Sequence, residues 1–176
     1  MPNEAKTTLT DDVVKHISQL LGRDPRGLED IAVRGPSGQP MVIRVASLVD
    51  NAPFPNLFWL VDPGIVYRID GDEAGGLIQR LQKIVDDDAQ IQSSLVDDHR
   101  AHITLRNSHM TAAIEEKLRS LNYYQVLQNR GIGGIADFGR IRCLHTWYAA
   151  HLVVPNTIGR LLDTQWRTEQ ETGVSK

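Results

Sequence analysis

The sequence has a single cysteine, no excess of positive charge and no long apolar run. One cysteine cannot form an internal disulfide, so we expect a protein of the reducing cytoplasm. The longest fully apolar stretches span only a few residues, such as 57–61, and this excludes a transmembrane helix. The start Met1-Pro2-Asn3-Glu4 has neither a basic segment nor an apolar core, so we expect no secretory signal.

The charge balance is slightly acidic, with a formal net charge of −3. Without a global positive field, neither nucleic acid nor a membrane is an expected partner. A chain of 176 residues that is 41% hydrophobic is about one globular domain. We expect a single α+β domain over residues 1–163, followed by a polar C-terminal tail over 164–176 that frays beyond Trp166.

The first half has the patterns of one helix and a small sheet. Thr10 can cap a helix whose apolar stripe ends at Gly22. Apolar segments at 31–34, 41–49, 57–61 and 65–69 follow, and Asp62-Pro63-Gly64 is expected to form a turn. Because the connections are too short for parallel crossovers, we predict an antiparallel meander of three to four strands.

After Gly71 the apolar spacing changes from two to about 3.6 residues, which predicts a helical half. Helices are expected over 77–85, from the acidic cap at 86–88 to about residue 106, and from Thr111 onward. A last helix from Ile141 to Val154, stopped by Pro155, is apolar around most of its circumference. This pattern predicts a buried C-terminal helix.

Residues 131–159 hold the strongest functional signal, with four of the fourteen glycines within 131–139, the only cysteine and two of the six histidines. A glycine loop before a helix can bind a phosphate or carboxylate through backbone N–H groups and guanidinium groups. The alternative is a loop that needs glycine to pass close to a helix. The expected ligand-binding residues are Arg23, Gly131, Gly133, Gly134, Arg140, Arg142, His151 and Asn156.

Three residues of this stretch are candidate catalytic groups. His145 is a candidate general acid or base, since imidazole titrates near neutral pH. Cys143 lies near the expected helix start, close to Arg140 and Arg142, and these charges would lower the pKa of a nucleophilic thiol. Asp137 is the nearest second reactive group in the sequence. The alternative is that Cys143 and His145 are ordinary core residues.

Cys143, His145 and His151 are residue types that bind metals, but they make a poor metal site if one continuous helix carries all three. At about 100° per residue, Cys143 and His145 point in nearly opposite directions, and His151 lies about 12 Å from Cys143 along the axis. We therefore predict no metal here. His99 and His102 are a better local pair, but a solvated or structural role is favoured for them. The sequence leaves the cofactor, if there is one, unknown.

Four segments of the chain form a recognisable set of motifs: 21–27 (LGRDPRG), 54–60 (FPNLFWL), 131–134 (GIGG) and 142–145 (RCLH), with His151, Asn156 and Gly159 beyond them. Together these motifs resemble those of one bacterial family, the domain of unknown function 501. The resemblance covers roughly residues 20–161. It implies a small bacterial cytoplasmic protein and no established activity.

The resemblance also points to one departure. Many members of the family carry cysteines in the turn that is 35–38 here and at the position of Asp62, and these would complete a thiolate metal site with the cysteine matching Cys143. This chain keeps only Cys143, so a zinc or iron–sulfur centre of that kind is not expected here.

Two hypotheses of function follow, and the sequence does not decide whether the protein is an enzyme. The first is binding of a small phosphate- or carboxylate-bearing ligand at the glycine loop and helix start. The alternative is a non-enzymatic interaction protein that presents the proline-braced aromatic segment 53–59 to a protein partner.

Overall fold

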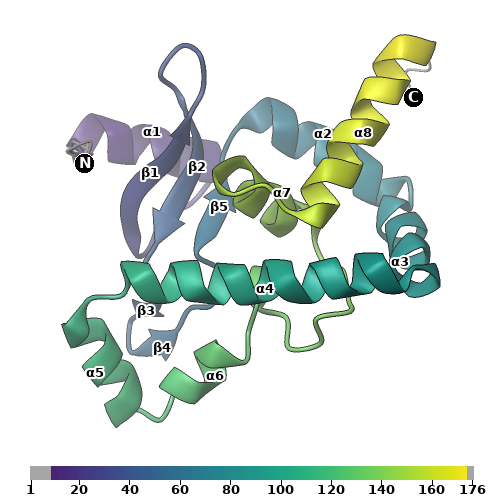
Figure 1. Cartoon of the computed structure of the whole chain (residues 1–176). Helices are drawn as coiled ribbons and strands as arrows, with labels where there is room; N and C mark the ends of the chain where they lie inside the picture. Colours follow the sequence, from purple (N-terminus) through teal and green to yellow (C-terminus); the bar gives the residue numbers. More distant parts are fainter. Residues whose placement is uncertain (1–8, 174–176) are drawn as a thin grey trace, which may run out of the picture.

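The computed structural model describes residues 9–173 and confirms an α+β fold with an N-terminal helix, a small antiparallel sheet and a helical half (Figure 1). Met1 to Glu4, on which the expectation about a signal rests, lie outside the described residues, as do the last three residues of the expected tail.

Helix α1 (Asp11–Leu21) forms as the sequence predicts. The Thr10 side chain accepts from the Val13 N–H, and Gly22 ends the helix in the left-handed conformation at φ 67°. The helix buries Ile17 against one face of the sheet, in a cluster with Ile31, Ile43, Val45 and Val61. This contact fixes the loop after α1, which carries Arg23, beside the sheet.

The sheet has the order β1 (Leu28–Arg34), β2 (Pro40–Val45), β5 (Phe58–Leu60), with both pairs antiparallel. A separate two-stranded hairpin, β3 (Leu48–Val49) and β4 (Ala52–Pro53), lies between β2 and β5 in the sequence. Val42, Phe58 and Leu60 face the larger core of the helical half. The small sheet is therefore covered on both faces, which explains its apolar runs.

The expected fourth strand at 65–69 is wrong, because these residues belong to helix α2 (Pro63–Ala74). Asp62 is its N-cap, and the carboxylate accepts from the Ile65 N–H at 2.9 Å. Pro63 occupies the first helical position, where its missing N–H costs nothing. The expected turn at 62–64 is thus the start of a helix, and this places Asp70 and Glu73 one turn apart near its end.

The next three helices follow the prediction more closely. They are α3 (Leu77–Asp87), α4 (Ala89–His109) and α5 (Ala112–Ser120), and a short helix that was not predicted, α6 (Tyr124–Gln128), comes after them. Asp88 caps α4 by accepting from the N–H groups of Gln90 and Ile91, and Thr111 caps α5 by accepting from Ile114. A short 3-10 turn, η1 (Ile132–Gly134), lies in the glycine loop.

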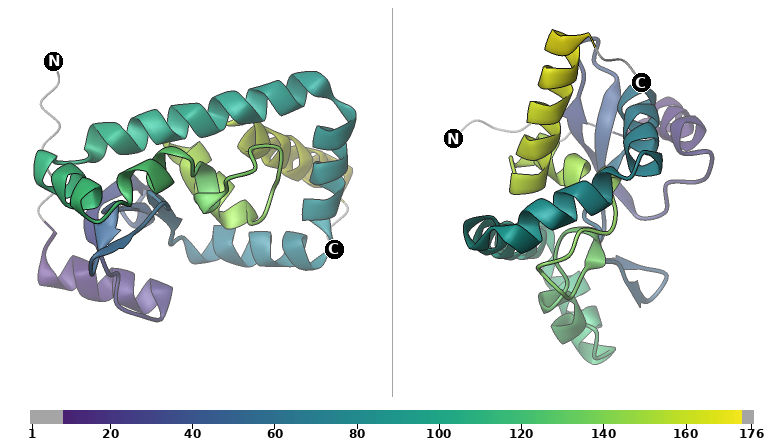
Figure 2. Two further views of the ribbon diagram at one scale, coloured as in Figure 1. Left: turned by 90° about the horizontal axis from the view of Figure 1, so that it is seen from below. Right: turned by 90° about the vertical axis from the view of Figure 1, so that its right-hand side faces the viewer.

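Helix α7 (Leu144–Val153) lies at the centre of the molecule, between α2 and α4 in the view from below (Figure 2). Its Leu144, Trp147 and Ala149 are fully buried, which confirms that this helix is buried, although a further helix follows it in the sequence. The helix begins at Leu144, three residues later than expected. Cys143 is its N-cap and has an extended backbone, with φ −150° and ψ 119°.

Helix α8 (Thr157–Thr172) continues through the segment expected to be a polar tail. The indole N–H of the buried Trp166 donates to the Asp72 carboxylate of α2 at 2.7 Å, which holds this part of α8 against the domain.

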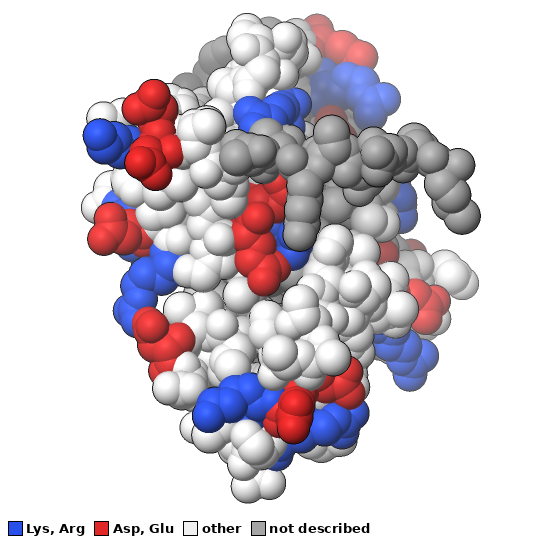
Figure 3. Space-filling model, turned by 90° about the vertical axis from the view of Figure 1, so that its left-hand side faces the viewer, with Lys and Arg blue, Asp and Glu red and all other residues white. Residues whose placement is uncertain are grey.

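Within residues 9–173, no helix is long and apolar enough to cross a bilayer. On the face shown in Figure 3, lysine and arginine are interspersed with acidic side chains and form no broad basic patch.

Arg106 on α4 joins two loops from inside the protein. Its fully buried guanidinium donates to the carbonyl oxygens of Pro55 at 3.1 Å, Arg130 at 2.9 Å and Leu127. Burial lowers the pKa of Arg106 to about 10, so the side chain stays charged at neutral pH. It therefore fixes the segment before β5 and the start of the glycine loop on the same helix.

We predict that Arg106→Met lowers the free energy of unfolding by about 3–5 kcal/mol, because buried carbonyl groups lose their donor. Urea denaturation measures this loss. The matched control is Arg100→Met on the same helix, where the side chain is exposed and the change should stay within about 0.5 kcal/mol. Equal stability of the two variants would contradict the assigned role.

Candidate functional site

The site is built where the end of α2 meets the start of α7. Glu73 lies in the last turn of α2, and its Oε1 accepts from the Leu144 N–H at 2.6 Å. The first N–H groups of a helix have no partner within the helix and carry partial positive charge. A carboxylate of the protein itself therefore occupies the helix start at which we expected an external anion.

Cys143 and His145 lie together, so the expectation that they point apart is wrong. The Sγ of Cys143 lies 3.7 Å from Nδ1 of His145. That expectation assumed a continuous helix through both residues, whereas Cys143 has the extended backbone of an N-cap. The two side chains can meet because only one of them belongs to the helix.

His145 contacts two carboxylates as well as the thiol. Its Nδ1 lies 3.5 Å from Oε1 of Glu73, and its Nε2 lies 3.1 Å from Oδ1 of Asp70. The His145 side chain is only 23% exposed, while Asp70 reaches it from the surface of α2. Each ring nitrogen thus faces an acceptor, an arrangement that stabilises the imidazolium form.

The thiol and the imidazole shift each other's pKa in opposite directions. The hydrogen bond with Cys143 is the main reason that the pKa of His145 rises to about 9, against the opposing effect of burial. Burial alone would raise the pKa of Cys143, but hydrogen bonds from His145 and the Thr146 backbone outweigh it, and the pKa falls below its usual value. The interaction therefore shifts Cys143 towards its thiolate form and His145 towards its imidazolium form.

A surface pocket of about 260 Å³ opens beside His145. Arg23 lines it from the loop after α1, Trp59 from β5, and His145 and Thr146 from α7; Leu21, Phe54, Asn56, Phe58 and Leu60 complete the lining. The Arg23 guanidinium lies 4.7 Å above the centre of the Trp59 ring. Arg23 and His145, which are far apart in the sequence, therefore meet at one concavity.

The glycine loop uses its N–H groups internally. Gly131 donates to the Ile135 carbonyl at 2.9 Å, Gly134 donates to the Gly131 carbonyl at 3.0 Å, and the Ile132 N–H donates to Nδ1 of His99 at 3.0 Å. A Cβ at Gly131 would overlap the His99 ring. Gly133 and Gly134 have positive φ, at 70° and 69°, and Gly133 passes close to Thr146. These contacts give the glycines a role in a tight loop against α4 and α7.

The other predicted residues of this loop lie away from His145. Arg140 is exposed and lies 3.8 Å from Asp86 and 3.9 Å from Asp137. Asp137 accepts from the Gly139 N–H at 3.0 Å. Arg142 is exposed. Among the described residues, the carboxylates that contact His145 are Asp70 and Glu73, and Asp137 is not one of them.

His151 and Asn156 hold α7 against α8. Nδ1 of His151 accepts from the Asn156 N–H at 3.0 Å, so the proton of the neutral ring is on Nε2, which donates to Asp163 at 2.9 Å. The Tyr148 hydroxyl donates to the other oxygen of Asp163 at 2.8 Å, and the Asn156 side chain caps α8. These partners fully account for both predicted ligand-binding residues.

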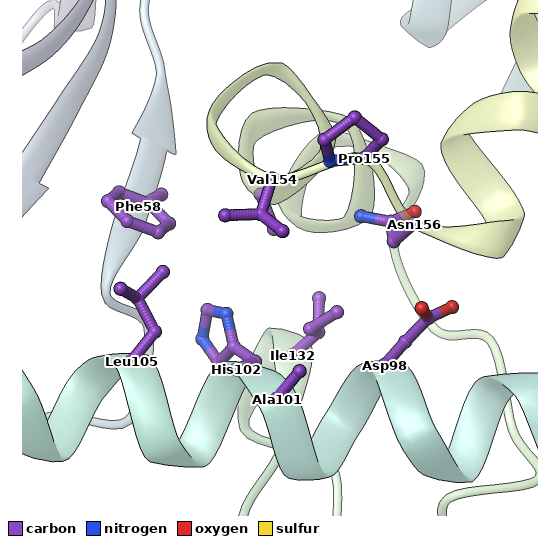
Figure 4. Close-up of a pocket in the computed structure, with 10 residues that line it drawn as sticks. Phe58, Asp98, Ala101, His102, Leu105, Ile132, Val154, Pro155 and Asn156 are labelled. Atoms are coloured by element: carbon purple, nitrogen blue, oxygen red, sulfur yellow. The ribbon is translucent and has the colours of Figure 1, made fainter.

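A second, smaller cavity of about 120 Å³ lies over α4 (Figure 4). His102 points into it between the apolar side chains of Phe58, Leu105 and Val154. Burial is the main cause that lowers the pKa of His102 to about 3, so the ring is neutral. This volume is well below that of typical ligand pockets, at about 300–1,000 Å³.

The sequence reasoning missed Asp70 and Glu73, because their segment was predicted to be a strand and its end. The signal was present in Asp62-Pro63, an N-cap residue followed by proline at the first helical position. A helix from Pro63 would have placed the two carboxylates on neighbouring turns.

Comparison with known proteins identifies a family and nothing more. The sequence model of a family described as a protein of unknown function (DUF501) matches residues 31–164. The chain belongs to this family. No curated protein and no solved structure matches the chain. Because the family is described as one of unknown function, the function of this protein has to be inferred from the geometry of the site.

The contact of Gly159 with His151 is testable by a matched pair of glycine substitutions. Gly159→Ala should lower the free energy of unfolding by about 1–3 kcal/mol, because the added methyl would overlap the His151 ring. Gly71→Ala, in α2 with open space around it, should raise it by about 0.5–1 kcal/mol. Urea denaturation gives both values, and a Gly159→Ala protein as stable as wild type would refute the contact.

The pairing of Cys143 with His145 predicts the pH dependence of thiol alkylation. In chelator-treated protein, the rate of alkylation by iodoacetamide should have its midpoint below that of a free thiol, about 8.5, because the thiolate is the reacting form. His145→Gln removes the imidazolium, so the thiol pKa rises and the rate at neutral pH falls.

Mass spectrometry of the alkylated protein measures both profiles. His16→Gln, at an exposed histidine on α1, is the control and should leave the midpoint unchanged. A wild-type midpoint at or above the free-thiol value would show that the two side chains do not interact as described.

Proposed function

We propose that this protein binds a small organic anion in the pocket between Arg23 and His145. The observation that carries the proposal is the convergence of these two residues, from the first loop and the last buried helix, on one concavity. The proposal keeps the carboxylate- or phosphate-bearing ligand expected from the sequence. The main group that binds the anion is now the guanidinium of Arg23, and no longer the N–H groups of the glycine loop.

Arg23 has the properties of an anion-binding side chain. Within residues 9–173, no carboxylate pairs with its guanidinium, which instead lies over the Trp59 ring. Stacking of this kind orders the guanidinium at little entropic cost and leaves its N–H groups free for a carboxylate or phosphate. The nearby Arg26, in contrast, is already paired with Asp50.

The remaining lining suggests a ligand with an apolar body. Leu21, Phe58 and Leu60 contribute apolar surface, while Asn56 and Thr146 supply polar groups. Oδ1 of Asn56 is buried and has no hydrogen-bond partner among the described residues, so a donor on a ligand would satisfy it. At about 260 Å³, the pocket suits a compact ligand such as an aromatic or short aliphatic carboxylate or phosphate ester.

The structure offers less support for segment 53–59 as a docking site for a protein. Phe54 lies 5.5 Å from Trp59, ring centre to ring centre, and both side chains pack against the cluster beneath α1. Aromatic side chains held in this way form the wall of a pocket and are not projecting anchors.

A thermal-shift series with inorganic phosphate, benzoate and phenyl phosphate tests the proposal. We expect phenyl phosphate or benzoate to raise the unfolding midpoint of the wild type, with a stabilisation of about 2.7 kcal/mol at a hundred times the dissociation constant. Arg23→Gln should abolish the shift. Arg26→Gln, in the same loop, is the matched control and should preserve it.

Two outcomes would contradict the proposal. One is a wild-type protein that no probe stabilises. The other is a shift that is equally large in Arg23→Gln and Arg26→Gln, which would place the bound anion elsewhere.

A further inference from the structure

Three side chains beside the pocket present metal-ligating atoms to one point. They are Glu73 at the end of α2, Cys143 at the N-cap of α7 and His145 in the first turn of α7. A carboxylate oxygen, the Sγ and a ring nitrogen all lie within 4.8 Å of one another. Because Cys143 and His145 lie at the start of α7 and Glu73 at the end of α2, the tertiary fold and not the local sequence creates this cluster.

The distances agree with those between the ligands of a tetrahedral zinc ion. In a tetrahedral site, a zinc–sulfur bond of about 2.3 Å and a zinc–nitrogen bond of about 2.05 Å place the sulfur and the nitrogen about 3.6 Å apart. A nitrogen and an oxygen ligand of the same ion lie about 3.3 Å apart. The protein has 3.7 Å between Sγ of Cys143 and Nδ1 of His145, and 3.5 Å between that nitrogen and Oε1 of Glu73. A metal ion would require only small movements of the side chains.

The surrounding contacts hold the ligands in position. Asp70 lies 3.1 Å from Nε2 of His145, which is the nitrogen that faces away from the cluster. A carboxylate on the far nitrogen of a histidine is the usual outer contact of a metal-binding histidine, because it fixes the ring and its tautomer. Glu73 is oriented by the Leu144 N–H, and the Thr146 hydroxyl donates to the Cys143 carbonyl at 2.9 Å.

We infer that Glu73, Cys143 and His145 form a binding site for one divalent transition-metal ion of the zinc type. The mixed set of sulfur, nitrogen and oxygen ligands selects this class of ion. Calcium and magnesium bind mainly through oxygen, and the cluster has too few oxygen ligands for either. The prediction from sequence that this stretch holds no metal ion depended on Cys143 and His145 pointing apart, which they do not.

Three protein ligands leave a fourth position for water or a bound group, as in zinc sites that take part in chemistry. All three residues are partly exposed, so solvent can reach the cluster. His145 also lines the Arg23 pocket, so the bound ion would lie one side chain away from a ligand there. The metal site rests on the triangle of ligands alone and stands whether or not the pocket binds an anion.

Cobalt binding tests the site directly in the full-length, untagged and reduced protein. We expect Co²⁺ to bind with one-to-one stoichiometry and to give the near-ultraviolet absorption of a cobalt–thiolate bond, since Cys143 is the only thiol. Zinc should displace cobalt and remove the band. A wild-type protein that binds no cobalt, or binds it without this band, would overturn the inference irrespective of any variant.

Variants then identify the ligands. Cys143→Ser should abolish the band, and Glu73→Gln and His145→Gln should weaken zinc binding more than Asp70→Asn does. Asp70→Asn, which removes an outer contact, should weaken it about 10- to 100-fold. The exposed Asp137→Asn is the control and should bind zinc as wild type does. Circular dichroism checks that each variant is folded, and unchanged affinity in folded Glu73→Gln would refute its role as a ligand.

Discussion

The carboxylate of Glu73 on the N–H of Leu144 is the contact on which the site depends. It joins the end of α2 to the start of α7, the most buried helix of the protein. The contact also places Glu73 beside His145, to which Asp70 is added from the preceding turn of the same helix. A negative charge is favourable at a helix start, so one interaction both stabilises α7 and assembles the cluster.

Around this contact, other buried polar groups fix the neighbouring segments. Arg106 holds the segment before β5 and the start of the glycine loop on α4, and the glycines let that loop pass close to His99 and Thr146. His151, Asp163 and Asn156 hold α8 against α7. These groups bond mainly to the protein itself, whereas the Arg23 pocket and the Glu73–Cys143–His145 cluster present groups that can contact a ligand.

The sequence alone predicted most of the elements but not the site. The helix caps at Thr10, Asp88 and Thr111 were predictable because each capping side chain acts on its own neighbours. The segment 65–69 was mistaken for a strand because a short apolar run does not distinguish a strand from a buried helix. Because of that error, Asp70 and Glu73 were not recognised as two carboxylates on neighbouring turns of one helix. It also left Asp137 as the nearest apparent partner of His145.

The position of Cys143 was missed for a different reason. The apolar spacing of Ile141, Leu144 and Tyr148 predicts one helix from Ile141, and no pattern in the sequence indicates that the backbone at Cys143 is extended. The cluster depends on that single deviation and on a contact between residues that are 71 positions apart. Both are properties of the tertiary structure.

The most direct test of the account is the amide proton of Leu144, observed by NMR. A bond of 2.6 Å to a carboxylate predicts a strongly downfield, slowly exchanging amide whose downfield shift decreases in Glu73→Gln, where the acceptor loses its charge. An ordinary, rapidly exchanging Leu144 amide in the wild type, unaffected by Glu73→Gln, would contradict the arrangement from which the site is built.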